Sequence, residues 1–176
     1  MIDREARFRR LFDAHYGSLH AFARRRIAPA EVDDLVADVL TTAWRRLDDV
    51  PEDAELPWLY GVARGTLANQ RRSSERRLRL IDRLRTDLPS QAPDAPPATP
   101  APGPVLAALE RLRPADRTIL QLAAWEGLRP AELAVVLGCG PNAAALRLSR
   151  ARKRFRAELT GTDASRTSQE WKVTDG

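Results

Sequence analysis

Residues 129–155 decide the fold of the C-terminal half, and they read RPAELAVVLGCGPNAAALRLSRARKRF. The pattern predicts a helix, a three-residue turn and a second helix that becomes steadily more basic. Four apolar residues of the second helix recur at positions i, i+4, i+7 and i+11 and are expected to be buried. They are Ala144, Leu148, Ala151 and Phe155. The residues expected to face outward together are Asn142, Ala143, Arg147 and Arg150.

A helix, a short turn and a second, basic helix form the pattern of a helix-turn-helix, whose second helix enters the major groove of DNA. Its first residues would meet the edges of the bases, and its later arginines would meet phosphates. The basic run RARKRFR also has a simpler interpretation as the solvated end of a surface helix, because the helix dipole favours cations near a C-terminus. The preceding turn and a second basic segment elsewhere in the chain favour DNA binding.

Charge is distributed unevenly along the 176 residues, whose formal net charge is +5 and whose isoelectric point is about 10.3. Residues 31–55 hold nine acidic residues and two arginines. Residues 64–85 hold eight arginines and two acidic residues, and residues 142–156 hold six Lys or Arg and no acidic residue. This distribution predicts one acidic and two basic surfaces, and an anionic partner for the basic ones.

Residues that could build a catalytic or metal site are scarce. The chain has one cysteine, Cys139, and two histidines, His15 and His20, so neither a disulfide framework nor a zinc site is expected. It has no Gly-rich phosphate loop and no HExxH or GxSxG motif. No run approaches the roughly 18 apolar residues of a membrane span, and the N-terminus lacks a signal-peptide core. We therefore expect a cytoplasmic protein with no membrane insertion, no cofactor and no enzymatic activity.

A proline-rich segment separates two regions of helical periodicity. Residues 86–104 contain seven of the 13 prolines and no periodic apolar residues, as is typical of a linker. The apolar spacing on either side predicts an all-α fold with two small helical domains, at residues 1–85 and 105–159. The polar residues 160–176 are expected to form a disordered tail. Individual helices are expected at residues 8–27, 31–49, from 57 onward, and at 105–112, 114–125, 130–137 and 141–159.

Both predicted domains resemble one protein family. Residues 113–159, RPADRTILQLAAWEGLRPAELAVVLGCGPNAAALRLSRARKRFRAEL, are similar to the promoter-binding region 4 of extracytoplasmic-function sigma factors of bacterial RNA polymerase. Residues 11–50, LFDAHYGSLHAFARRRIAPAEVDDLVADVLTTAWRRLDDV, followed by PWLYGVARGTLANQRR at 57–72, look like region 2 of the same family. The resemblance implies a non-enzymatic subunit that recognises a minus-35 element as duplex, helps to melt the minus-10 element and promotes transcription initiation.

The resemblance also implies partners and contact residues. The partners are the core polymerase, through its β′ clamp helices and β flap, duplex and melted promoter DNA, and in many family members an anti-sigma factor. The outward face of the acidic helix would bind core polymerase through Asp34, Ala37, Asp38, Thr41, Thr42 and Arg45. Most family members carry Gln-Glu where this chain has Ala37-Asp38. The apolar stripe of the same helix includes Trp44, which is expected to be a core residue.

The third helix would bind the melted strand of the minus-10 element. The residues assigned to this contact are Trp58, Tyr60, Arg64, Gly65, Asn69, Arg71 and Arg72. Tyr60 and the arginines are expected to lie away from the apolar stripe, where bases stack on rings and cations follow phosphates. Trp58 is more often a core residue than a stacking surface. Gly65 stands where the family commonly has Asn. The arginines and Asn69 are therefore expected to contact only the sugar-phosphate backbone of the DNA strand.

The second helix of the helix-turn-helix would read the minus-35 element. The residues assigned to it are Asn142, Ala143, Ala145, Leu146, Arg147, Ser149, Arg150 and Lys153. At Ala145-Leu146 the family usually has Lys-Ser or Arg-Ser, and the apolar pair can instead pack on thymine methyl groups. Arg129 replaces a frequent Ser or Thr cap, which is offset by Pro130 and by Glu132 near the helix dipole.

Two other classes of function remain open on the residues alone. A stand-alone helix-turn-helix regulator would bind duplex operators without polymerase and would give a footprint by itself. An enzyme that acts on nucleic acid would need a metal cluster or a catalytic His and carboxylate set, which the sequence does not provide.

Overall fold

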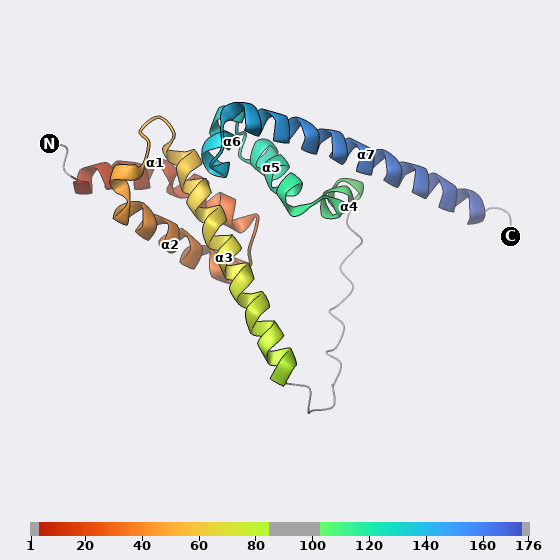
Figure 1. Ribbon diagram of the computed structural model, residues 1–176, viewed down its shortest axis with the longest axis horizontal. Coiled ribbons are helices and arrows are strands. Elements are labelled where there is room, and N and C mark those ends of the chain that lie inside the picture. Colours follow the sequence, from red (N-terminus) through yellow and green to blue (C-terminus); the bar gives the residue numbers. More distant parts are fainter. Residues whose placement is uncertain (1–3, 85–102, 174–176) are drawn as a thin grey trace. The chain divides into compact units, whose positions relative to one another are not determined.

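The computed structural model describes the backbone of residues 4–84 and 103–173, with side chains for residues 4–79 and 103–160. Within these ranges the chain is helical and has no β-strand, which confirms the predicted all-α class (Figure 1). Two short 3₁₀ turns, η1 (Pro29–Glu31) and η2 (Leu47–Asp49), flank the second helix. The helices are α1 (Arg4–Arg24), α2 (Val32–Arg45), α3 (Glu55–Leu84), α4 (Pro104–Arg111), α5 (Pro114–Trp125), α6 (Pro130–Leu137) and α7 (Pro141–Val173).

The first of two compact units contains α1, α2 and α3, each of which packs against the other two. The apolar stripes predicted from the sequence meet in its core. Each fully buried Val, Leu or Phe side chain contributes roughly 1.5–3 kcal/mol to stability. The core includes Leu11, Leu19, Phe22, Leu35, Val36, Val39, Leu59, Ala63 and Leu67. The C-terminal half of α3 extends beyond α1 and α2 (Figure 1).

The acidic helix α2 is shorter than predicted and ends at Arg45 instead of Asp49. Arg46 takes a non-helical conformation, with φ −114° and ψ 29°, and its Nε donates a hydrogen bond to Asp49 at 2.9 Å. The following turn η2 buries Leu47. The helix therefore ends where the chain turns to place Leu47 in the core.

The second unit contains α4 and α5 packed against α7. Proline is the first residue of α4, α5, α6 and α7, in agreement with its preference for the start of a helix. The observed bounds of α5 and α6 are those predicted. Pro104, which the sequence analysis placed in the linker, begins α4. The linker residues 86–102 lie outside the described residues, and Gly103 directly precedes α4.

The last helix is longer than the sequence suggested. We predicted an end at Leu159 and a disordered tail from residue 160, but the backbone of α7 is helical to Val173. The polar segment after Leu159 contains no proline, and polar residues are compatible with an exposed helix. Low hydrophobicity was therefore a poor indicator of where this helix ends.

Candidate nucleic-acid interface

The first four turns of α7 have one buried and one exposed face. Ala144, Leu148 and Ala151 are buried, as predicted, whereas Phe155 is only half-buried. All eight residues that the resemblance assigns to minus-35 DNA are exposed. They are Asn142, Ala143, Ala145, Leu146, Arg147, Ser149, Arg150 and Lys153. The fold thus presents the predicted set on one accessible surface.

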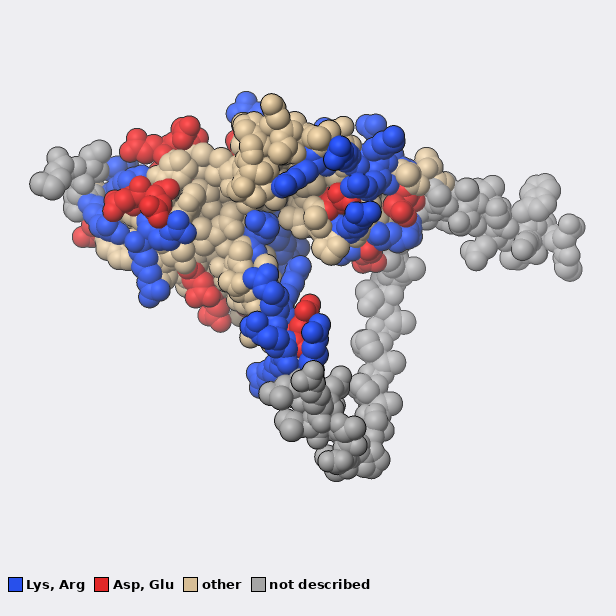
Figure 2. Space-filling view, in the orientation of Figure 1, with Lys and Arg blue, Asp and Glu red and all other residues tan. Residues whose placement is uncertain are grey.

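Three cations of this surface are not neutralised by the fold. Among the described residues, none forms a hydrogen bond or ion pair with the side chains of Arg147, Arg150 or Lys153. Figure 2 shows Lys and Arg side chains over the second unit, with acidic side chains among them. The charges of Arg147, Arg150 and Lys153 are available for phosphates, which make the largest electrostatic contribution to protein–DNA affinity.

Two other arginines hold α7 in place. Nη1 of Arg154 donates to both carboxylate oxygens of Asp116 in α5, each at 2.9 Å, and the Asp116 side chain is only 12% exposed. Arg111 in α4 donates from Nε to Glu158 at 2.9 Å. The exposed face of α7 therefore lies on a helix that is bonded to both α4 and α5.

A further arginine caps the C-terminal end of α4. Arg117 of α5 donates from Nε to the carbonyl oxygen of Leu109 at 2.9 Å, and its Nη2 donates to the carbonyls of Glu110 and Leu112. The last carbonyl groups of a helix have no partner within the helix, so this side chain satisfies groups that would otherwise need water.

Sequence reasoning missed these structural arginines. It assigned Arg154 to a single basic block and gave Asp116 no role. The available signal was the position of Asp116, which lies one turn before the buried Ile119 on the same side of α5. A carboxylate on a buried face needs a cationic partner, because an unpaired buried charge is costly.

The helix-turn-helix starts with a cap that replaces the missing Ser or Thr. The backbone N–H of Arg129 donates to Oε2 of Glu132 at 2.7 Å, which is one half of a capping box. Gly127 and Gly138 have φ values of +66° and +61°, the left-handed conformation that commonly ends a helix. The expected compensation by Glu132 is therefore a direct hydrogen bond. The turn before α7 consists of Gly138, Cys139 and Gly140.

The outward face of α2 is acidic and accessible. Of the six residues assigned to core polymerase, Asp34, Ala37, Asp38, Thr41 and Arg45 are exposed. The sixth, Thr42, is half-buried and donates from its hydroxyl to the carbonyl oxygen of Asp38 at 2.9 Å. No ion pair with another described residue engages the carboxylates of Asp34 or Asp38.

Trp44 is not the core residue that the stripe predicted. Its side chain is 40% exposed, because Ala43 and Leu47 occupy the buried positions at this end of α2. The ring of Phe8 packs against it edge-on at 5.3 Å between centroids, and the guanidinium of Arg4 lies 5.3 Å from its centroid. Trp44 therefore borders the acidic face at the margin of the core.

The prediction that Tyr60 lies away from the apolar stripe is also wrong. Tyr60 is 3% exposed and stacks on Phe22, with ring centroids 4.9 Å apart. Tyr60, Ala63 and Leu67 are spaced i, i+3 and i+7, so they form part of the buried stripe of α3. The tyrosine ring is thus not a surface on which an unpaired base could stack.

The remaining minus-10 residues differ in exposure along α3. Trp58, Arg64 and Gly65 are half-buried, and the guanidinium of Arg46 lies 5.6 Å from the Trp58 ring centroid. Asn69, Arg71 and Arg72 are exposed, and Arg72 donates a hydrogen bond to Oδ1 of Asn69. Figure 2 shows that Lys and Arg side chains cover the extending half of α3. The exposed arginines beyond the assigned set are Arg76, Arg77 and Arg79.

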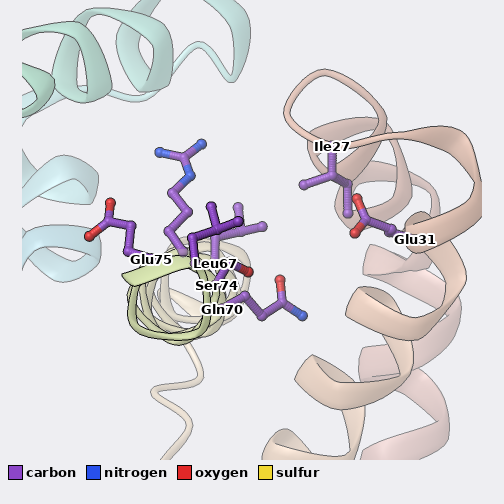
Figure 3. Close-up of a pocket in the computed structure, with 8 residues that line it drawn as sticks. Ile27, Glu31, Leu67, Gln70, Ser74 and Glu75 are labelled. Atoms are coloured by element: carbon purple, nitrogen blue, oxygen red, sulfur yellow. The ribbon is translucent and has the colours of Figure 1, made fainter. Parts of the chain in front are cut away.

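A cleft of about 300 Å³ lies between α3 and the junction of α1 and α2. Figure 3 shows Ile27 and Glu31 on one side of it and α3 on the other. Arg71 lines the cleft together with Glu31 and Glu75. Among the described residues, no ion pair joins Arg71 to either glutamate. The α3 residues of the lining are Leu67, Gln70, Arg71, Ser74, Glu75 and Leu78.

Within the described ranges, no group of three or more His, Cys, Asp or Glu side chains is arranged to hold a metal ion. A helix long and apolar enough to cross a membrane is likewise not found in the described part of the chain.

Comparisons with known proteins identify both halves. The family model for sigma-70 region 2 matches residues 11–77, and that for sigma-70 region 4 matches residues 103–155. The RNA polymerase sigma factor NccH of Alcaligenes xylosoxydans xylosoxydans is 30% identical over 166 residues, which cover 86% of each chain. The ECF RNA polymerase sigma factor SigL of Mycobacterium tuberculosis is 29% identical, over 88% of this chain and 89% of SigL.

A solved structure shows a similar fold. The sigma factor RpoE of Bartonella quintana, in complex with the anti-sigma factor NepR, matches with a TM-score of 0.61 and 25% identity over 87% of this chain and 96% of RpoE. Matches to both sigma regions, in this order and in one chain, agree with the two helical units and with the similarity to NccH along most of the sequence. The chain therefore belongs to the extracytoplasmic-function sigma factors of the sigma-70 family, non-enzymatic proteins that act in transcription initiation.

Proposed function

We propose that this chain binds the core RNA polymerase and directs it to promoters with a minus-35 and a minus-10 element. The observation that carries the proposal is the exposed face of α7. Its cations Arg147, Arg150 and Lys153 have no partner among the described residues, and the helix is joined to α5 by an ion pair with the nearly buried Asp116 and to α4 by an exposed ion pair. A folded helix with outward cations meets the requirements of major-groove binding, because the backbone that carries the contact residues is already ordered before binding.

The acidic face of α2 is the proposed binding site for core polymerase, at its β′ clamp helices. Among the described residues, no ion pair engages the carboxylates of Asp34 and Asp38, and the apolar stripe of α2 is buried without them. Exposed charges without an internal partner are available for electrostatic complementarity with a binding partner.

The exposed end of α3 is the proposed binding site for the melted minus-10 strand. Asn69, Arg71 and Arg72 supply polar and cationic contacts, and the half-buried Trp58 replaces Tyr60 as the aromatic residue that a base can reach. Because no nucleotide-hydrolysis motif occurs in the sequence, strand opening would be driven by binding energy to unpaired bases.

An anti-sigma factor is the regulator that we propose for this chain, since RpoE of Bartonella quintana was solved in complex with one. Purification of the tagged chain from its own cells, followed by identification of any protein bound in a one-to-one ratio, tests this. A chain that is always recovered either alone or with polymerase would argue against such a regulator.

Transcription and co-purification with purified core polymerase test the main proposal. The double variant Asp34→Lys/Asp38→Lys should lose co-purification and promoter-directed transcription, while its helical circular dichroism stays unchanged. A matched control, Glu52→Lys/Asp53→Lys, changes the charge equally at two exposed acidic residues outside α2 and should still bind polymerase. Undiminished polymerase binding by the first variant would refute the α2 assignment. A footprint without polymerase would instead support a stand-alone regulator.

A further inference from the structure

Leu146 lies at the centre of the exposed face of α7. It is two residues from both Ala144 and Leu148, which places it about 160° around the helix from each of these buried side chains. Its own side chain is 51% exposed. Asn142, Ser149 and Arg150, at positions i−4, i+3 and i+4, are its neighbours on the helix surface. A large apolar group thus occupies the middle of a polar and cationic surface.

An exposed leucine at this position has no hydrogen-bonding group, so its contact must be apolar. The major groove displays hydrogen-bond donors and acceptors on every base pair but only one apolar group, the C5-methyl group of thymine. The polar neighbours Asn142 and Arg150 are placed to contact the bases or phosphates around that methyl group. Ala145 lies about 100° away from Leu146, at the edge of the same surface.

We infer that Leu146 reads the C5-methyl group of one pyrimidine in the minus-35 element, an inference that rests on the proposed binding of α7 to duplex DNA. Thymine presents an O4 acceptor beside its methyl group, whereas cytosine presents an N4 donor. A leucine side chain cannot distinguish these two groups, because it forms no hydrogen bond with either. The contact therefore depends on the methyl group and not on the base, and 5-methylcytosine substitutes for thymine at this contact.

The test uses the complete holoenzyme and a minus-35 duplex selected by the wild-type protein. At each pyrimidine of the element, four versions of the duplex are compared: thymine and deoxyuridine opposite adenine, and 5-methylcytosine and cytosine opposite guanine. At one position, loss of the methyl group should weaken binding about fourfold within both pairs, which corresponds to about 0.8 kcal/mol for one buried methyl-sized group. Other positions should show no such effect.

Variants then assign the effect to the side chain. Leu146→Ser and Leu146→Ala should bind methylated and unmethylated duplexes equally, because both remove the apolar contact on an exposed helix face. Leu106→Ala in α4 is the matched control, since Leu106 is 49% exposed and lies on a different helix. This variant should retain the methyl effect of the wild-type protein.

Three results would overturn the inference. Tight wild-type binding with equal affinity for methylated and unmethylated duplexes at every position would contradict it while leaving the proposed function intact. A methyl effect that persists in Leu146→Ser would assign the reading to another residue. If the minus-35 element contributes nothing to wild-type binding and Arg150→Ala binds as the wild type does, the proposed function of α7 fails together with the inference.

Discussion

Each of the two units of this sigma factor is stabilised by its own set of contacts. The first has a core of large apolar side chains, and the second has fewer such side chains and several arginine contacts between its helices. Of the largest side chains that are fully buried, only Leu122 and Leu133 belong to the second unit. Those of the first unit are Phe22, Leu11, Leu19, Leu35, Leu47, Leu59 and Val39.

This difference shows that arginine has two separate roles in the second unit. Arg111, Arg117 and Arg154 connect helices, whereas Arg147 and Arg150 point outward without a partner among the described residues. Counting charges along the sequence cannot separate the two roles. They are separated by whether an acceptor such as Asp116 or a helix-terminal carbonyl lies within reach.

The largest effect is expected in the apolar core of the first unit. Leu59→Ala should lower the free energy of unfolding by about 2–5 kcal/mol, because Leu59 is 0% exposed and its removal leaves a cavity. Chemical denaturation followed by circular dichroism measures this loss. The control Leu78→Ala changes the same residue type in the same helix at a 63% exposed position and should shift stability by less than about 0.5 kcal/mol. Equal effects would contradict the assignment of Leu59 to the apolar core of the first unit.

The second-largest effect concerns the ion pair between Asp116 and Arg154 in the second unit. Asp116→Asn should cost about 1–3 kcal/mol of stability, because Arg154 loses a nearly buried, doubly hydrogen-bonded partner. The control Glu158→Gln breaks the pair with Arg111, whose side chains are 44% and 40% exposed, and should cost less than about 1 kcal/mol. Thermal unfolding of both variants decides whether burial makes the first pair the stronger one.

The two roles of arginine can be separated by two substitutions within one turn of α7. Arg154→Ala should lower thermal stability, whereas Arg150→Ala should leave it unchanged and weaken promoter binding. For a phosphate contact at Arg150, the slope of log K against log salt should become shallower by about 0.9. Salt titrations with holoenzyme measure the slope. Destabilisation by Arg150→Ala would show that this arginine also supports the fold.

The smallest effect is expected from the added charge in Ala145→Lys. Ala145 is exposed at the edge of the outward face of α7. The lysine should therefore reach a phosphate and steepen the slope of log K against log salt by about 0.9 without affecting stability. Binding to non-promoter DNA should rise as well, which reduces the preference for the native minus-35 element. An unchanged salt slope would mean that this edge of α7 does not face DNA.

Much of the fold could be predicted because its helices are punctuated by proline and carry regular apolar stripes. The bounds of α5 and α6 and the buried face of α7 follow from these local features. Trp44 was misplaced because it lies at the margin of its stripe, where Ala43 and Leu47 occupy the buried positions. Tyr60 was misplaced because it was interpreted as a surface aromatic residue, although its spacing from Ala63 and Leu67 places it on the buried stripe. The pairing of Asp116 with Arg154 joins residues 38 positions apart, which no local pattern reveals.

The candidate site was predictable to the extent that exposure follows from helical periodicity. The faces of α2 and α7 were located in this way, and their contacts with polymerase and DNA remain predictions. The end of α7 was missed because a polar sequence without proline is compatible with both an exposed helix and a tail.

Cys139 has a practical consequence for experiments that follow promoter binding. It is the only thiol in the sequence and lies in the turn between α6 and α7, two residues before the first helical residue of α7. A maleimide dye would therefore attach at a single, known place without any substitution. Because that place adjoins the surface proposed to enter the major groove, the natural sequence already contains a reporter position for time-resolved fluorescence of promoter engagement.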